Sequence, residues 1–425
     1  MDFKQDLILY GNENKTFGDK VCALSLALAP LLQHYKGLIE NAGFTILLLI
    51  TPILLLRTIE KFKIGLHNRK CFFAIVPLAA FFFYTILVRD FNGMRLGYVF
   101  LMVWIFMCVS NGSINIPYFF KYATWIALLA AGAVFVQYVS QNFFGRTIEL
   151  RPLSYLVSQD VIWVRNAERM NDVGYMSRPS GFFLEPSHFF LYTFPIITIL
   201  LLSAKKNRKH FKMALFLSLG LLLSTSGMGV AFVLGIWLLY FALYRKQTYG
   251  GKVRIKDLFT VNNVILVVFF GFAVLLAYNY IPFFHHSIER IFTEDETTNA
   301  IDGRVRLAQN YVRRISGRAV WFGTPNVREE LDFNLSGFFA TYIKWGVFGL
   351  IFSYWFYIQG LFKLKGPYFW LSLIIVVVSY YSAHTHGTFY MLYYLIILMN
   401  GYYETSIKDE KDSCQLENSE IELNS

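Results

Sequence analysis

Charged residues are scarce in this chain: they make up 16% of its 425 residues, whereas about 25% is usual in soluble proteins. Hydrophobic residues make up 56% and aromatic residues 18%, so most of the folded surface must face lipid rather than water. Apolar runs recur from about residue 21 to residue 403. Because a helix needs roughly 20 residues to cross a hydrocarbon core, they predict an all-α, polytopic transmembrane helical bundle of about 12 spans.

Cysteine is also scarce, with four residues in the chain. Cys22, Cys71 and Cys108 fall in apolar runs and Cys414 lies in the polar C-terminal tail, so their spacing predicts neither a disulfide framework nor a metal site. The sequence also lacks a Walker A loop, a Rossmann glycine fingerprint, and the HExxH and GxSxG motifs in a suitable context. These absences argue against nucleotide-driven chemistry, and we expect no metal and no cofactor.

Basic residues gather in short connections between alternate apolar runs. In a soluble protein the formal net charge of +11 would suggest a nucleic-acid partner, but in a membrane protein such connections mark the cytoplasmic side. We therefore expect no nucleic-acid partner and place both termini in the cytoplasm. The predicted order is a cytoplasmic N-terminus (1–20), spans 1 to 5 (21–140), a first outer loop (141–181), spans 6 to 9 (182–280), a second outer loop (281–335), spans 10 to 12 (336–403) and a disordered cytoplasmic tail (404–425).

Lysine is missing from both predicted outer loops, whose twelve basic residues are all arginine. A guanidinium group binds phosphate through two parallel hydrogen bonds and keeps its charge, whereas an ammonium group offers a point charge. One interpretation is that some of these arginines recognise phosphate or diphosphate groups. The other is that they pair with the twelve acidic residues of the same loops.

Part of the second loop has helical periodicity. Apolar residues fall on one side and polar residues on the other: Val305, Ala308, Val312 and Ile315 against Arg306, Asn310, Arg313 and Arg314. This pattern predicts a short amphipathic helix on the outer membrane face with a ridge of arginines. The ridge either binds the substrate or meets only lipid headgroups.

The stretch from Arg178 to His188, R-P-S-G-F-F-L-E-P-S-H, puts three ionisable residues at the mouth of a predicted membrane helix. Such residues are costly near lipid, so they indicate a functional site facing a cavity. Glu185 and His188 share one face if the helix has begun by Phe182. Arg178 would then stabilise a departing diphosphate, and Glu185 or His188 would take the proton of an attacking hydroxyl. In the simpler alternative, Glu185 pairs with Arg178 to fix the loop and His188 is a hydrogen-bonded buried residue.

Three further polar residues lie within or beside later spans. Lys344 is too far inside its span for the side chain to reach water easily, so we expect it to pair with a carboxylate or to face a cavity. His384 and His386 lie near the outer end of the eleventh predicted span. Their spacing is too slender a basis for a metal site, and we interpret them as ordinary interfacial histidines.

Five short segments and the order of the predicted spans carry a resemblance to a known family. The segments are R-P-S-G-F-F-L-E-P-S at 178–187, S-T-S-G-M-G at 224–229, G-T-P-N at 323–326, D-F-N-L-S-G at 332–337 and K-W-G-V-F-G-L at 344–350. Together with two large outer loops in a helical bundle, they resemble the O-antigen polymerase and ligase superfamily. The most similar branch is that of the polymerases of bacterial O-antigen and capsular polysaccharide repeat units.

This resemblance implies a membrane glycosyltransferase that uses no nucleotide sugar, metal or cofactor. Such an enzyme transfers a growing glycan from undecaprenyl diphosphate to a sugar hydroxyl of a new lipid-linked repeat unit, at the outer face of the bacterial cytoplasmic (inner) membrane. The expected partners are the undecaprenyl-diphosphate-linked oligosaccharide and membrane lipid. A chain-length regulator and a flippase are further candidate partners.

In this family, arginines of the two outer loops are held to bind the diphosphates. The matching positions here are Arg178 in the first loop and Arg304, Arg306, Arg313 or Arg314 in the second. Ligase members place a histidine near the start of the span after the second loop, where this chain has Asp332 and Asn334. The resemblance therefore favours a polymerase over a ligase and leaves the general base open among Glu185, His188 and Asp332.

Two alternatives to a polymerase remain. A ligase that joins a finished glycan to another acceptor is the nearest enzyme. A transporter, such as a lipid-linked oligosaccharide flippase, belongs to a different class and would need charged residues distributed through the spans on both sides of the midplane. The ionisable residues singled out here gather instead at the predicted outer side.

Overall fold

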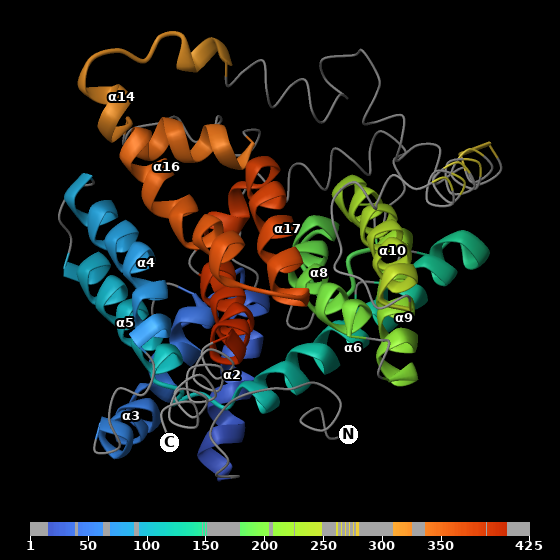
Figure 1. The fold of residues 1–425 in the computed structure, drawn as a ribbon, viewed down its shortest axis with the longest axis horizontal. Helices are drawn as coiled ribbons and strands as arrows, with labels where there is room; N and C mark the ends of the chain where they lie inside the picture. The colour runs from blue at the N-terminus through green and yellow to red at the C-terminus, as the bar shows by residue number, and fades with distance from the viewer. Residues whose placement is uncertain are drawn as a thin grey trace, which may run out of the picture. The chain divides into compact units, whose positions relative to one another are not determined.

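The computed structural model consists almost entirely of helices, with no strand among the residues it describes (Figure 1). Those residues are 16–38, 41–62, 69–88, 93–146, 148, 150, 179–203, 207–224, 226–248, seven positions between 261 and 279, 309–324, 336–387 and 389–405. The elements are α2 (Phe17–Leu32), α3 (Ala42–Phe62), α4 (Arg69–Val88), α5 (Gly93–Ser110), α6 (Ile116–Phe144), α8 (Pro186–Leu202), α9 (Arg208–Leu223), α10 (Gly227–Thr248), α14 (Arg318–Phe322), α16 (Gly337–Lys363), α17 (Pro367–Tyr381) and the 3-10 turn η4 (Ala383–His386). A further helix covers residues 389–405.

Several of these helices are apolar enough for a membrane. By length and composition, three could cross one, namely the segment Ala42–Ile59 of α3, and the helices α6 and α16. Shorter apolar helices are Val99–Ser110 in α5, Gly227–Leu243 in α10, and the helices α8 and α17. The helical architecture is therefore compatible with a membrane protein, and the number of spans stays a prediction.

The two apolar runs that meet at Ser226 and Gly227 form separate helices, α9 and α10. Helix α9 ends where the N–H of Ser224 donates to the carbonyl of Gly220 at 3.0 Å. Helix α10 starts where the Ser226 hydroxyl accepts the N–H of Gly229 at 3.3 Å. Serine next to a helix start satisfies backbone groups that the helix leaves free. Within the S-T-S-G-M-G segment, Ser224 therefore ends α9, and Gly227 to Gly229 form the first turn of α10.

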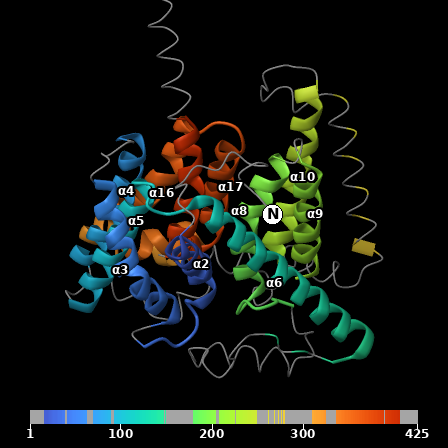
Figure 2. The same ribbon diagram turned by 90° about the horizontal axis from the view of Figure 1, so that it is seen from below.

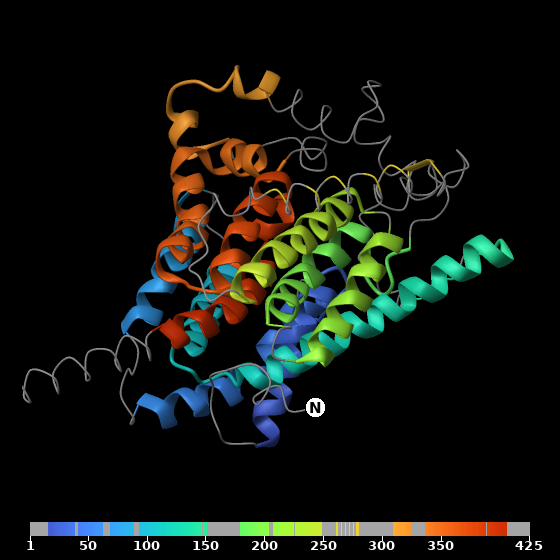
Figure 3. The ribbon, with the colours of Figure 1, turned by 45° about the vertical axis from the view of Figure 1, so that its right-hand side comes forward.

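The chain divides into two compact units, one made of residues 1–33, 37–123 and 304–425 and the other of residues 34–36 and 124–303. In the first unit, α2 packs on α3, α4 packs on both α5 and α16, and α17 packs on α16 (Figure 3). The helix at 389–405 supplies much of the core of this unit, because its side chains from Tyr390 to Leu398 are almost fully buried.

In the second unit, α9 and α10 pack against α8 and against each other (Figure 2). Helix α8 is apolar on all sides, and every residue from His188 to Leu201 is buried, as such a helix requires. Helix α9 comes close to α6 at Gly220, where an added Cβ would lie 2.9 Å from the Cβ of Ala131. The start of α8, where the sequence analysis predicts a functional site, therefore belongs to a closely packed group of helices.

Candidate functional site

Four of the eight predicted site residues lie in the part of the chain that the structure describes. Glu185 and His188 belong to the second unit, and Arg313 and Arg314 belong to the first. The other four, Arg178, Arg304, Arg306 and Asp332, lie outside the described residues. The two units are therefore considered separately.

The turn after Arg178 is fastened to α6. The side-chain oxygen of Gln137 in α6 accepts the backbone N–H groups of Ser180 at 3.1 Å and Gly181 at 2.9 Å. Gly181 has a φ of +63°, and an added Cβ would lie 2.6 Å from the carbonyl oxygen of Ala130. Only glycine combines this left-handed backbone with so close an approach. The segment that follows Arg178 is thus pressed against the backbone of a helix.

Glu185 is the residue that precedes α8. The helix begins at Pro186, four residues later than Phe182, so Glu185 is the N-cap rather than a residue on a helical face shared with His188. Its carbonyl accepts the N–H of His188 at 3.1 Å, and its carboxylate accepts the hydroxyl of Ser187 at 2.7 Å. The negative charge of the Glu185 carboxylate also lies near the N-terminus of α8, where the helix dipole is positive. The carboxylate is therefore held in a defined place at the start of α8.

His188 lies in the first turn of α8 and stacks on a histidine that the sequence interpretation did not single out. Its side chain is 1% exposed. The ring of His34 lies parallel to it, with the ring centres 4.3 Å apart and the planes at 14°. Beside this contact, the hydroxyl of Tyr35 donates to the carbonyl of Phe182 at 3.5 Å. No spacing rule connects positions so far apart in the sequence, so only the fold reveals the pair.

In the first unit, helix α16 is broken at Gly346, whose φ of 66° and ψ of −164° are not helical. The break leaves backbone carbonyls without their usual partners. The backbone N–H and the hydroxyl of Thr324 donate to the carbonyl of Ile343 at 2.8 Å and 3.1 Å. The hydroxyl of Tyr84 donates to the carbonyl of Trp345 at 2.6 Å. Backbone groups that are removed from water have to be satisfied within the protein, and these contacts do so.

Two glycines allow the chain near α14 to lie directly on this break. An added Cβ at Gly346 would lie 2.3 Å from the carbonyl oxygen of Trp321, and one at Gly323 would lie 2.4 Å from the carbonyl oxygen of Lys344. The start of the G-T-P-N segment therefore packs on the K-W-G-V-F-G-L segment. Lys344 lies two residues before this break instead of inside a continuous helix.

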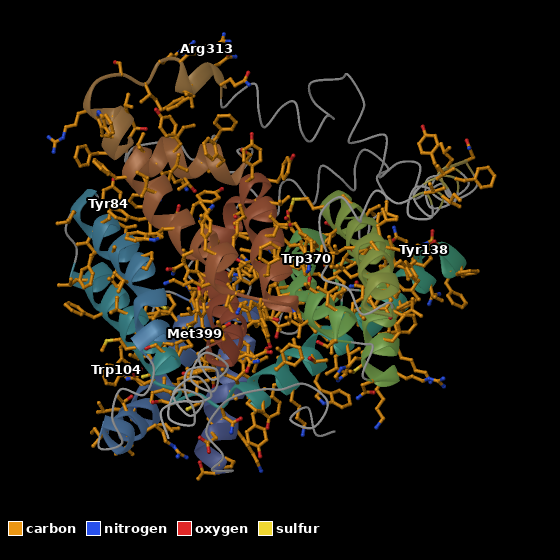
Figure 4. All side chains as sticks on the ribbon, viewed as in Figure 1. Tyr84, Trp104, Tyr138, Arg313, Trp370 and Met399 are labelled. Carbon is orange, nitrogen blue, oxygen red and sulfur yellow. The ribbon has the colours of Figure 1, made fainter. Side chains whose placement is uncertain are left out.

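Arg313 and Arg314 are exposed on the segment that precedes α14. Their apolar neighbours Val312 and Ile315 pack instead against Ala340 and Ile343 of α16. The side chain of Arg313 points away from the helices of its unit (Figure 4). Tyr84, which contacts the break in α16, lies on α4 (Figure 4). Apolar side chains thus hold this segment on α16 while the arginines face outward.

A histidine whose two ring nitrogens are buried lies in η4, which packs on α16 and α17. The ring of His386 lies 4.8 Å from the ring of Tyr354. Burial lowers the pKa of His386 to about 4, so its imidazole is neutral at pH 7. Nearby, an added Cβ at Gly337 would lie 2.1 Å from the carbonyl oxygen of Ser379. Within the described ranges, no group of three or more His, Cys, Asp and Glu side chains is placed to hold a metal ion.

Comparisons with known proteins identify no relative: no family model, no curated protein and no solved structure matches the chain. The function therefore has to be inferred from the residues and their arrangement.

Proposed function

We propose that the protein polymerises undecaprenyl-diphosphate-linked oligosaccharide repeat units into bacterial O-antigen or capsular polysaccharide. The observation that carries the proposal is the start of α8, where a carboxylate and an imidazole are fixed at the first turn of a buried helix. Arg178 precedes this turn in the chain. The absence of lysine from the predicted outer loops, and the five segments that resemble the polymerases, support an anionic diphosphate as part of the substrate.

In the proposed reaction, the oxygen of an acceptor sugar hydroxyl bonds to the anomeric carbon of the growing glycan. The bond between that carbon and the diphosphate oxygen breaks, and its electron pair leaves with the diphosphate. Arg178 stabilises the charge on the leaving group. The resemblance implies that arginines of the second loop also bind a diphosphate. The hydroxyl proton passes to a base of the protein, for which Glu185, His188 and Asp332 are the sequence-based candidates.

The placement of charge in the first unit supports an extracytoplasmic position for Arg313 and Arg314, whose segment packs on α16. Tyr84 lies near the C-terminal end of α4 and contacts the break in α16. The other end of α4 begins at Arg69, and the other end of α16 finishes at Lys363, followed by Lys365. Because basic connections stay in the cytoplasm, the broken part of α16 and the residues packed on it would face outward.

A lipid-linked oligosaccharide flippase is the second candidate, and the break at Gly346 is the observation that favours it. Discontinuous helices often form the substrate sites of transporters. A flippase moves a lipid-linked unit across the membrane and forms no glycosidic bond. A ligase forms one bond, but to an acceptor other than a lipid-linked repeat unit.

Deletion of the gene, followed by gel electrophoresis of the surface polysaccharide, separates these functions. Loss of the ladder of long chains with retention of a single repeat unit supports the polymerase. Loss of every repeat unit from the surface would point instead to a flippase or a ligase.

Complementation of that deletion with Arg178→Ala tests the site. We expect single repeat units only, with unchanged abundance of the protein in the membrane, because the leaving group loses its stabilising charge. Arg146→Ala is the control, since Arg146 is an exposed arginine of the same predicted loop, and it should restore long chains. Long chains in the Arg178→Ala strain would contradict the role assigned to Arg178.

A further inference from the structure

We propose that Tyr84 is a positioning residue, whose hydroxyl holds the arginine-bearing segment 309–322 in one place on α16. This inference rests on the proposed polymerase function, in which arginines of that segment bind a lipid-linked diphosphate. Tyr84 belongs to α4 and the segment includes α14, so the two are distant in the sequence but belong to the same compact unit. The hydroxyl acts on the substrate through the arginines and does not touch it.

The Tyr84 hydroxyl lies where three segments meet. It donates to the carbonyl of Trp345 in α16 at 2.6 Å and lies 3.4 Å from the carbonyl oxygen of Trp321 in α14. The side chain is buried, and the centre of its ring lies 6.5 Å from that of Phe348 and 5.6 Å from that of Phe352. A ring packed in this way has little freedom to turn, so the hydroxyl is offered to both carbonyls from a fixed position.

The place of this contact matters because α16 is broken at the residue after Trp345. Gly346 has non-helical backbone angles, and an added Cβ there would lie 2.3 Å from the carbonyl oxygen of Trp321. At a glycine break, the angle between the two halves of a helix depends on contacts from outside the helix. Tyr84 supplies such a contact from α4, which packs on α16. Its hydroxyl therefore ties the end of the first half of α16 to a separate helix.

The arginine-bearing segment rests on both halves of α16. Val312 and Ile315 pack against buried residues of the first half. At the other end of the segment, the guanidinium carbon of Arg318 lies 5.4 Å from the centre of the Phe322 ring. That ring centre in turn lies 5.5 Å from the ring centre of Phe348, in the second half. A change of angle at the break therefore displaces the arginines.

The segment is suited to an anionic ligand. Residues 309–322 include Arg313, Arg314 and Arg318 and no acidic residue, and all three arginines are exposed. A guanidinium group binds phosphate through two parallel hydrogen bonds, which requires a defined direction. Displacement of the segment weakens this contact equally before and during the reaction. Such a loss of uniform binding raises KM and leaves kcat unchanged.

Tyr84→Phe tests the tie, because it keeps the ring and removes the hydroxyl. The purified variant is reconstituted in liposomes with an undecaprenyl-diphosphate-linked repeat unit, and the rate of glycosidic bond formation is measured against the concentration of that unit. We expect KM to rise about fivefold, as the loss of one hydrogen bond allows, with kcat within about twofold of the wild type. Thr324→Val removes a second hydroxyl at the break, which donates to the carbonyl of Ile343 at 3.1 Å, and should raise KM in the same direction.

Tyr403→Phe is the matched control. The Tyr403 hydroxyl also donates to two backbone carbonyls of the same unit, those of Val109 at 3.0 Å and Ser110 at 2.9 Å. Neither carbonyl belongs to α16 or to the arginine-bearing segment. The two phenylalanine variants should therefore lose similar stability in detergent denaturation, whereas KM of Tyr403→Phe should stay within about twofold of the wild type.

A combination of variants shows whether Tyr84 acts through the arginines. In a background that carries Arg313→Lys, Arg314→Lys and Arg318→Lys, the charges remain but the paired hydrogen bonds to phosphate are lost. Tyr84→Phe should change KM by less than about twofold in this background, because binding by point charges depends little on direction. A merely structural role of Tyr84 would raise KM by the same factor in both backgrounds.

Three results would each overturn the role of Tyr84. They are an unchanged KM in both Tyr84→Phe and Thr324→Val, an equal rise of KM in Tyr403→Phe, and the same rise in the lysine background. If the wild-type protein itself forms no glycosidic bonds in this assay, the proposed polymerase function fails. Bonds formed by the wild type together with any of the three contrary results would overturn the positioning role alone.

Discussion

Replacement of Gly181 by alanine tests how the turn between Arg178 and α8 is bound to α6. Gly181 has a φ of +63°, and an added Cβ would lie 2.6 Å from the carbonyl oxygen of Ala130. Ordinary contacts of this kind are longer than 3 Å, and the carbonyl belongs to the backbone of α6, so the turn rather than the helix has to move. Moving it breaks the hydrogen bonds from Ser180 and Gly181 to Gln137.

The magnitude follows from three contributions. A left-handed backbone costs a non-glycine residue about 1–2 kcal/mol, and the reduced freedom of the unfolded chain offsets this by about 0.4–1 kcal/mol. The two lost hydrogen bonds contribute about 1 kcal/mol each. We therefore expect Gly181→Ala to lower the free energy of unfolding by about 3 kcal/mol.

Gly145→Ala is the matched control. Gly145 belongs to the same unit and has a φ of +62°, but nothing lies within 4 Å of an added Cβ. It should therefore show the backbone strain alone, about 1 kcal/mol or less. Denaturation of both variants in detergent measures the difference in their free energies of unfolding. Gel electrophoresis of the surface polysaccharide then shows whether displacement of the turn after Arg178 reduces polymerisation. Equal stability of the two variants would refute the reasoning.

Three further predictions concern the first unit. Gly346→Ala should lower the free energy of unfolding by more than Gly366→Ala, because both glycines have a positive φ but only Gly346 lies against backbone; similar losses in detergent denaturation would contradict the packing at the break. Since the pKa of His386 is lowered from 6.5 to about 4, the unfolded state binds the proton first, and the wild type should lose about 3 kcal/mol of stability as pH falls through this range. His386→Phe should weaken that pH dependence, and an unchanged stability profile would count against a neutral buried imidazole. Arg313→Lys should shorten the polysaccharide chains if a guanidinium binds diphosphate through two hydrogen bonds; chains of wild-type length on a gel would argue against it.

Hydropathy was enough to predict the helical class, because apolar runs of this length are typical of helices and too long for ordinary strands. It was not enough to locate the start of α8. The apolar pair Phe182 and Phe183 resembles the start of a helix, but Gly181 adopts a left-handed conformation and the residue before Pro186 is disfavoured in the α region. Proline at the first helical position therefore fixes the start at Pro186.

The break in α16 and the histidine pair could not be predicted in the same way. The residues around Gly346 stay apolar, so the hydropathy of the segment does not change where the helix stops. The break is maintained by Tyr84 and Thr324, which are distant in the sequence. Likewise, only the ring contact with His188 shows that His34 lies beside the start of α8. Local patterns predict helices, whereas these features depend on contacts between remote segments.

The most direct test of the central claim is a reconstitution of the purified protein in liposomes that contain one defined undecaprenyl-diphosphate-linked repeat unit. The account predicts a ladder of glycans that grows by whole repeat units, with one undecaprenyl diphosphate released for each new bond, and without added nucleotide sugar. Repeat units that stay unjoined, or that only cross the bilayer, would contradict it.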